Sequence, residues 1–114
     1  MRRSVPVLLA DALAAAGSIG VIVSGATWDE YSATRMLRSA LERELLIIGE
    51  ALNALDDISD EARDRVTHLG RIIGLRNRLA HAYDLIDDLM VWSIACDEIP
   101  ALQRELQEWL EASI

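Results

Sequence analysis

Apolar residues return every three or four positions along almost the entire chain, and this period restricts the fold more than any other feature. The alternation of apolar and polar residues that a half-buried strand needs persists nowhere. The clearest helical case is the apolar stripe of residues 28–56, which contains Tyr31, Leu37, Leu41, Leu45, Ile48, Leu52 and Leu55. Such a stripe lines one face of a helix. The sequence therefore predicts an all-α protein.

Local signals set the ends of the expected helices. The tetrapeptide "TWDE" is a capping box, in which the Thr27 hydroxyl accepts from the Glu30 amide while the Glu30 carboxylate accepts from the Thr27 amide. Ser59 is expected to cap a short helix, and Asp87 or Asp88 to cap the last helix. The main helices are then expected at residues 4–24, 28–56, 69–83 and 88–112.

Two residues inside these ranges predict further detail. Pro100 interrupts the last helix, so a kink or a fresh start is expected near Asp97. Gly49 costs about 1 kcal/mol relative to Ala within a helix, and close approach of a neighbouring helix is the usual reason to keep it. A chain of 114 residues has room for one domain. We expect residues 1–114 to form one antiparallel bundle of four main helices and a short helix.

The N-terminal segment admits two interpretations. Two Arg precede an apolar run, as in a signal peptide, but Asp11 places a charge in the middle of that run. The apolar positions also follow helical spacing, at Val5, Leu8, Leu9, Ala12, Ala16, Ile19 and Val23. We therefore expect a helix that packs in the core rather than a targeting signal, and no association with a membrane.

The charge of the chain is negative but uneven. A net charge of −8 would make the molecule as a whole repel nucleic acid, and DNA is not expected as a partner. Residues 63–78 contain five Arg and one Asp, a local charge of +4, which leaves −12 for the rest of the chain. This basic strip is either a chance feature of a helical surface or a place where a phosphate backbone binds.

Several reactive side chains are better explained by packing than by chemistry. The single cysteine, Cys96, cannot form an internal disulfide, which fits a reducing cytoplasm, and its apolar helical surroundings favour a core role over a nucleophile. Neither His68 nor His81 follows a Glu by three residues, as carboxylate-bridged metal sites in bundles require, so no metal and no other cofactor is expected. Packing residues are expected at Trp28, Trp92 and Trp109. Helix-surface charges are expected at Glu42, Arg43, Glu44 and Glu50.

The segment "GLRNRLAHAYD", residues 74–84, places polar residues among apolar ones in an expected helix. On a wheel with 100° per residue and Arg76 at zero, the core face lies at roughly 240–340°. It contains Ile72, Leu75, Leu79, Ala82 and Tyr83. A second face, at roughly 100–160°, points away from the core. We call it the polar stripe, and it consists of Gly70, Gly74, Asn77 and His81. Arg76 stands at the edge of the core face, and Arg78 flanks the polar stripe.

These side chains are suited to handling a phosphate. An imidazole titrates near neutral pH, so it can take a proton from a hydroxyl or pass one to a leaving oxygen. A guanidinium can hold a phosphate with two hydrogen bonds and stabilise the charge that develops in a transition state. A histidine on a helix surface is more often structural, however, and composition alone leaves both interpretations open.

A resemblance makes the catalytic interpretation specific. "RNRLAHAY" has Arg76, four residues, His81, one residue and then Tyr83, and it resembles the signature of HEPN domains, in particular the HepT toxin subfamily. The flanking helices are similar to that subfamily too. The matching segments are "TWDEY", "LERELLIIGEAL", "IIGLRNRLAHAYDLID" and "VWSIACDEIPALQREL", which together extend the resemblance over about residues 5–110.

The resemblance implies a metal-independent endoribonuclease that works as a homodimer, with two motifs meeting in a cleft at the two-fold axis. In this family Arg76 would bind the scissile phosphate and His81 would be the acid–base residue, with Asn77 and Arg78 in support. Arg76 and His81 are five residues apart, roughly 140° on the wheel, which is awkward for one compact site on one helix. Two copies meeting at an axis relieve that, and Gly70 and Gly74 suit such a close approach.

The resemblance also implies a partner. In the family a nucleotidyltransferase antitoxin, encoded as a separate chain, transfers AMP to the residue that Tyr83 matches and silences the toxin. Tyr83 can alternatively be a packing residue at the end of its helix. A different class of function also stays open, in which the chain is a non-catalytic helical subunit that dimerises and docks a nucleotidyltransferase. The strongly acidic body favours that alternative, while the intact set of Arg76, His81 and Tyr83 favours the ribonuclease.

Overall fold

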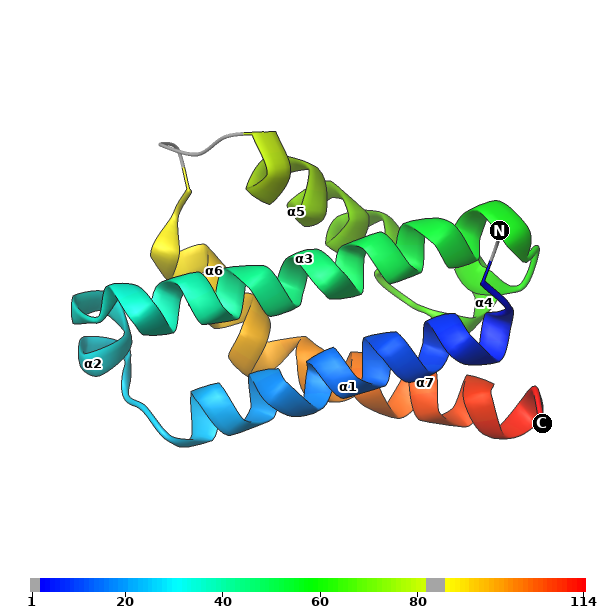
Figure 1. Cartoon of the computed structure of the whole chain (residues 1–114), viewed down its shortest axis with the longest axis horizontal. Coiled ribbons are helices and arrows are strands. Elements are labelled where there is room, and N and C mark those ends of the chain that lie inside the picture. The colour runs from blue at the N-terminus through cyan, green and yellow to red at the C-terminus, as the bar shows by residue number, and fades with distance from the viewer. Residues whose placement is uncertain (1–2, 82–85) are drawn as a thin grey trace.

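Helices form the whole of the secondary structure in the part of the chain that the computed structural model describes, residues 3–81 and 86–114. The elements are α1 (Val5–Ser24), α2 (Trp28–Ala33), α3 (Arg35–Ile58), α4 (Ala62–Arg65), α5 (Leu69–His81), α6 (Asp88–Asp97) and α7 (Ile99–Ala112) (Figure 1). The predicted all-α class is confirmed. Seven helices are described where four main helices and a short one were expected, because two of the predicted helices are divided.

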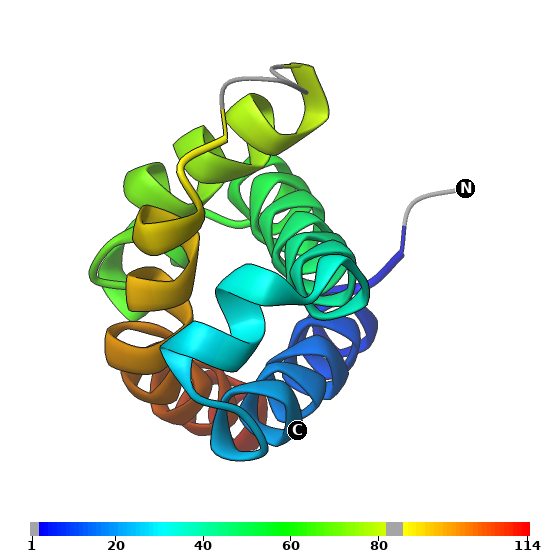
Figure 2. The same cartoon turned by 90° about the vertical axis from the view of Figure 1, so that its left-hand side faces the viewer.

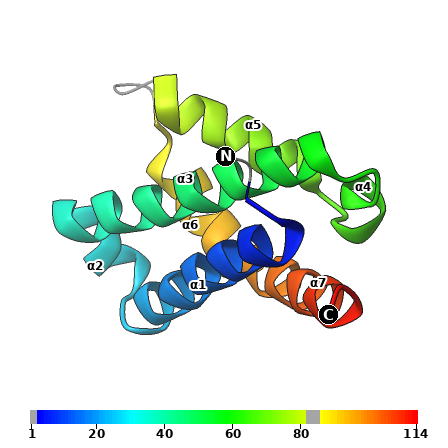
Figure 3. The same cartoon turned by 45° about the vertical axis from the view of Figure 1, so that its right-hand side comes forward.

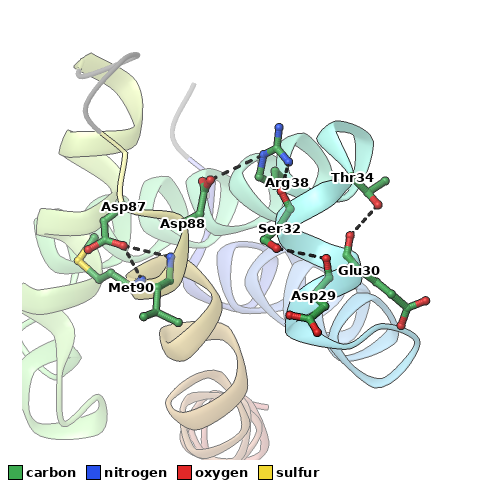
Figure 4. Close-up of polar contacts among 9 residues, drawn as sticks. Asp29, Glu30, Ser32, Thr34, Arg38, Asp87, Asp88 and Met90 are labelled. Atoms are coloured by element: carbon green, nitrogen blue, oxygen red, sulfur yellow. Dashed lines mark hydrogen bonds and ion pairs between the residues drawn. The ribbon is translucent and has the colours of Figure 1, made fainter.

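Two of the predicted caps, Thr27 and Asp87, begin their helices. At the start of α2, the Glu30 amide donates to the Thr27 hydroxyl over 3.2 Å and the Thr27 amide donates to the Glu30 carboxylate over 2.9 Å. Of the two candidate caps for α6, Asp87 has this role, since its Oδ1 accepts from the amides of Leu89 and Met90 (Figure 4). The signals that lie within one turn of a helix end were therefore readable from the sequence.

The single helix expected over residues 28–56 is broken at Thr34, so that prediction was wrong. Thr34 has extended backbone angles, with φ −114° and ψ 102°, and its hydroxyl donates to the Glu30 carbonyl over 2.6 Å. The Ser32 hydroxyl donates to the Asp29 carbonyl in the same way, and the Arg38 guanidinium donates to the Ser32 carbonyl (Figure 4). Side chains that bond local carbonyls offer the backbone an alternative to the helix ladder. Helix α2 consequently ends at Ala33, and α3 begins at Arg35, directly after Thr34.

Two other boundaries differ in detail from expectation. The fresh start predicted near Asp97 is confirmed, because α6 ends at Asp97 and α7 begins at Ile99 with Pro100 in its first turn, where a missing amide costs nothing. The short helix begins later than predicted, since Glu61 rather than Ser59 precedes α4 as its cap residue. The Ser59 hydroxyl instead accepts from the Glu61 amide over 3.2 Å.

Helix α3 forms the centre of the arrangement. It lies between α1 on one side and α5 on the other, and α7 runs beside α1 (Figures 1 and 3). Viewed along the long axis, α1, α3, α5, α6 and α7 surround the interior, and α2 closes the near end (Figure 2). The buried side chains inside this ring are apolar, and Trp109 and Tyr31 are the largest of them. Tyr31 also packs against Trp28 and Trp92, which confirms the predicted packing role of the tryptophans.

Helix α1 is the one described helix that is long and apolar enough to cross a membrane, by length and composition alone. A third of its apolar window is buried inside the fold, at 33%. The buried residues are Leu8, Leu9, Ala12, Ala15, Ala16 and Ile19. These side chains face α3 and α7, as the helical spacing predicts for a core-packing helix.

Candidate functional site

Helix α5 presents two different faces. Leu69, Ile72 and Leu75 are buried toward the core, as the helical wheel predicts. Asn77 and His81 are exposed on the opposite side. A Cβ built on Gly70 or Gly74 would meet no described atom within 4 Å. The predicted polar stripe therefore exists as a solvent-facing surface with open space above its two glycines.

Gly49 of α3 makes room for the side chain of Arg76. A Cβ built on Gly49 would lie 2.2 Å from the Arg76 Cβ and 2.7 Å from its Cγ, which is far inside van der Waals contact. The aliphatic stem of Arg76 thus rests directly on the backbone of α3. The expectation that a neighbouring helix approaches closely at Gly49 is confirmed, and the neighbour is α5.

The guanidinium of Arg76 is held by two polar partners. Its Nη1 donates to Asn77 Oδ1 over 2.9 Å, and its Nη2 lies 3.7 Å from Glu50 Oε1 on α3. Its Nε is buried and has no hydrogen-bond partner among the described residues. With 27% of the side chain exposed, Arg76 lies at the edge of the core, where the wheel puts it, and one part of the guanidinium remains accessible.

His81 is the last residue of α5 and is exposed. Arg76 leans onto α3, whereas His81 belongs to the solvent-facing stripe. Among the described residues of one protomer, the polar partners of Arg76 are Asn77 and Glu50, and no hydrogen bond connects Arg76 with His81. Tyr83, the predicted acceptor of AMP, lies in residues 82–85, outside the described residues. The structure thus brings together Arg76, Asn77 and Glu50, and it places His81 at the end of the same helix, five residues beyond Arg76.

The basic strip of residues 63–78 is largely neutralised by neighbouring carboxylates. Its ion pairs are Arg63 with Asp56 at 3.0 Å, Arg65 with Glu61 at 3.1 Å, Arg71 with Glu98 at 3.2 Å and Arg76 with Glu50 at 3.7 Å. Arg78 differs, because no carboxylate of a described residue lies within ion-pair distance and its Nη1 contacts the sulfur of Met90 at 3.4 Å. Among the described residues, Arg78 is therefore the arginine of the strip that no carboxylate neutralises.

Two alternative sites find no support in the described residues. Cys96 is half-buried, and burial, followed by the negative charge of Asp97, raises the pKa of its thiol. A thiol with a raised pKa holds little of the reactive thiolate at neutral pH. In residues 3–81 and 86–114, no group of three or more His, Cys, Asp or Glu side chains is arranged to hold a metal ion.

Glu50 is the site residue that the sequence alone does not reveal. Its position in α3 predicts an ordinary surface charge, and 53% of its side chain is exposed. What gives Glu50 a role is its neighbour Gly49, which lets α5 cross α3 at Arg76. The glycine was a usable signal for a close helix contact, but only the crossing shows which side chain comes within reach of Glu50.

Comparison with known proteins adds independent information. A family model described as "Ribonuclease HepT-like" matches residues 12–109. A relative from Methanocaldococcus jannaschii, named "Putative RNase MJ1380", is 30% identical over 108 residues, which is 93% of this chain and 96% of the relative. A second protein of that organism, "Putative RNase MJ0125", is 28% identical over 94% of this chain and 91% of its own length.

A relative from another organism is also named as an RNase. "Putative RNase TTE0752" from Caldanaerobacter subterraneus subsp. tengcongensis is 30% identical over 89 residues, covering 78% of this chain and 79% of the relative. No solved structure matches the chain. The similarity extends from α1 to α7 and includes the Arg76–His81 segment.

Proposed function

Since this chain belongs to the HepT-like ribonuclease family, we propose that it is a metal-independent endoribonuclease toxin that cuts RNA in the cytoplasm with Arg76 and His81. The observation that supports this most is the arrangement on α5. A partly exposed guanidinium, oriented by Asn77, lies next to an exposed stripe that ends in an imidazole. Within the part of the chain that the structure describes, Asn77 and His81 are both exposed, so packing does not account for them.

The proposed chemistry divides between the two residues. Arg76 holds a phosphate oxygen and stabilises the negative charge that develops on the phosphate as a hydroxyl attacks it. His81 removes a proton from the attacking hydroxyl or delivers one to the leaving oxygen. Arg78 contributes a cation for a neighbouring phosphate, since no described carboxylate neutralises it. Neither role requires a metal ion.

We propose that the complete site forms between two copies of the chain. Arg76 of one copy faces α3 while His81 faces outward, and a two-fold axis beside the polar stripe would bring a second Arg76 and His81 to the same cleft. Gly74→Leu tests this, because the protomer has open space at that position and should fold normally. Light scattering should show that Gly74→Leu weakens dimerisation. Gly20→Leu on α1, where a Cβ also meets no described atom within 4 Å, should dimerise like the wild type. A Gly74→Leu variant with unchanged dimer affinity would place the interface elsewhere.

We further propose that a separately encoded nucleotidyltransferase silences the toxin by transferring AMP to Tyr83. The added phosphate would compete with RNA for the arginines of α5, and the added nucleoside would fill the cleft. Co-expression with the partner, followed by peptide mapping, should find one AMP on Tyr83. A silenced complex with unmodified Tyr83 would show that docking of the partner is sufficient for inhibition.

The competing function is a non-catalytic subunit that dimerises and docks the nucleotidyltransferase, and the acidic surface is the observation that favours it. Expression of the chain alone separates the two functions. The ribonuclease predicts growth arrest, with new RNA ends that sequencing detects and that are missing with His81→Ala. A pure docking subunit predicts normal growth and an unchanged set of RNA ends.

A further inference from the structure

The Arg76 side chain is restrained along its whole length, and two of the restraints come from neighbouring residues of α3. We infer that Glu50 is a positioning residue that, together with Gly49, sets the orientation of the Arg76 guanidinium for its phosphate. The inference rests on the proposed ribonuclease function, because it assigns a role relative to the phosphate-binding arginine of that site.

The first restraint acts on the stem. The position that a Cβ would take on Gly49 is occupied by the Arg76 Cβ and Cγ, at 2.2 and 2.7 Å. No larger residue at position 49 would let the stem lie at this depth. Because the stem is fixed against the backbone of α3, only the outer torsions of Arg76 remain to be set by polar contacts.

The second restraint acts on the guanidinium plane. Nε is buried, so the edge of the guanidinium that includes Nε is closed to an outside ligand. The remaining edge joins Nη1 and Nη2, and each of these nitrogens has one partner, Asn77 at 2.9 Å and Glu50 at 3.7 Å. A planar guanidinium carries five N–H donors, so this edge can still offer two parallel bonds to a phosphate. Asn77 and Glu50 thus flank the one edge on which a phosphate can bind.

Stability does not explain the Arg76–Glu50 pair. At 3.7 Å, with side chains 27% and 53% exposed, it belongs to the class of surface ion pairs that contribute little to folding. Orientation is a better explanation, because an arginine side chain has many rotamers and an unrestrained one must be ordered when the substrate binds. The pair orders Arg76 before RNA arrives.

Glu50 also brings a negative charge close to the proposed phosphate site. A carboxylate there opposes phosphate binding, whereas a carboxamide keeps a polar oxygen beside the Arg76 guanidinium without that repulsion. Glu50→Gln should therefore keep kcat within about threefold of the wild-type value and lower KM. Glu50→Ala removes the paired carboxylate, and kcat should fall on the order of 10–100-fold, because a displaced phosphate-binding group lowers the rate of the chemical step.

The test is steady-state cleavage of one RNA by the full chain and four single variants. Glu50→Ala and Glu50→Gln are compared with Glu108→Ala, which removes an exposed carboxylate on α7, and with Arg76→Ala. The inference predicts a kcat defect for Glu50→Ala, recovery in Glu50→Gln and wild-type rates for Glu108→Ala. Equal rates for Glu50→Ala and Glu108→Ala would overturn it, and so would a Glu50→Gln variant as slow as Glu50→Ala.

A double variant shows whether Glu50 acts through Arg76. If it does, Glu50→Ala should slow the wild-type chain but should slow the Arg76→Ala chain no further. Equal slowing in both backgrounds would show that Glu50 acts by another route, and the inference would be wrong. Full activity of Arg76→Ala, by contrast, would contradict the proposed ribonuclease function itself, so the two failures are distinguishable.

Discussion

Helices α1 and α5 both pack against α3, from opposite sides, yet they relate to it in different ways (Figure 3). Helix α1 also contacts α6 and α7, and its buried residues are entirely apolar. Within the described residues, the extensive contacts of α5 are with α3 alone. The helix with several neighbours carries the core, whereas the helix with one main neighbour carries the candidate site.

This difference separates stability from activity along the chain. A side chain of α1 that faces α3 has apolar neighbours from more than one helix, so its loss leaves a cavity. The polar side chains of α5 face solvent, and the folded state gains little from them. Substitutions in α1 should therefore change the free energy of unfolding, and substitutions in the polar stripe or at Arg76 should change the rate of RNA cleavage.

The largest effect is expected from Arg76→Ala. Loss of the guanidinium should reduce the rate of RNA cleavage by about 10²-fold or more, since one charge-stabilising donor group is removed from the transition state. The free energy of unfolding should fall by less than about 2 kcal/mol, because the partly exposed ion pair contributes little and only the packing of the stem on α3 is lost. Cleavage assays and chemical denaturation on the same preparation measure the cleavage rate and the free energy of unfolding. A strongly destabilised variant would mean that Arg76 is chiefly a packing residue.

Leu9→Ala is the corresponding change in α1. Leu9 is fully buried, so its truncation should lower the free energy of unfolding by about 2–5 kcal/mol. The folded fraction should cleave RNA at the wild-type rate. Val21→Ala on the same helix is the matched control, because Val21 is 73% exposed, and denaturation should detect almost no change. Similar losses of unfolding free energy for Leu9→Ala and Val21→Ala would contradict the assigned orientation of α1.

Gly49→Ala probes the contact between α3 and α5. The new methyl group would overlap the stem of Arg76, and α5 must shift, which should cost about 1–3 kcal/mol of stability and also reduce activity. Gly17→Ala on α1 adds the same methyl group where no described atom lies within 4 Å. That variant should be as stable as the wild type or up to about 1 kcal/mol more stable. Equal behaviour of the two alanine variants would remove the argument for close packing at Gly49.

The smallest effect concerns Glu42 of α3. Burial, and then the negative charge of Asp88, raise the pKa of Glu42 above its ordinary value of 4.5, and Arg38 opposes the shift. A carboxyl whose pKa is raised by folding binds more protons in the folded state, so its contribution to stability is present below pH 4.5 and is lost as the pH rises through the folded value. Glu42→Gln should therefore raise the unfolding temperature at pH 7 more than at pH 4. Glu108→Gln is the exposed control, and an equal response of both variants would contradict the assigned cause.

The sequence predicts those parts of the structure that depend on neighbours within one or two turns. The period of apolar residues locates α1 and the core face of α5, and the caps at Thr27 and Asp87 locate helix starts. The break at Thr34 escaped prediction because hydroxyl groups compete there with an otherwise continuous helical pattern. The polar stripe was predictable too, since a wheel needs only the spacing of residues on one helix.

The parts that could not be predicted depend on how separate helices cross. Glu50 has no special sequence context beyond its neighbour Gly49, and its pairing with Arg76 follows from the crossing of α3 and α5. The same applies to the charge of the basic strip. Asp56 and Glu98 neutralise Arg63 and Arg71, although Glu98 is far from Arg71 in the sequence. A count of charges along the chain therefore overestimates the positive surface that RNA would meet.

The proposed mechanism is tested most directly by cleavage of a defined RNA by the purified chain, with and without His81→Ala, in the presence of a metal chelator. We expect the wild-type chain to cut in chelator and His81→Ala to be slower by about 10²–10⁴-fold, the usual contribution of a general acid–base residue. The unfolding temperature of the variant should be unchanged, because His81 is exposed. Cleavage that requires an added divalent metal ion, or that proceeds at the same rate without His81, would contradict the proposed mechanism.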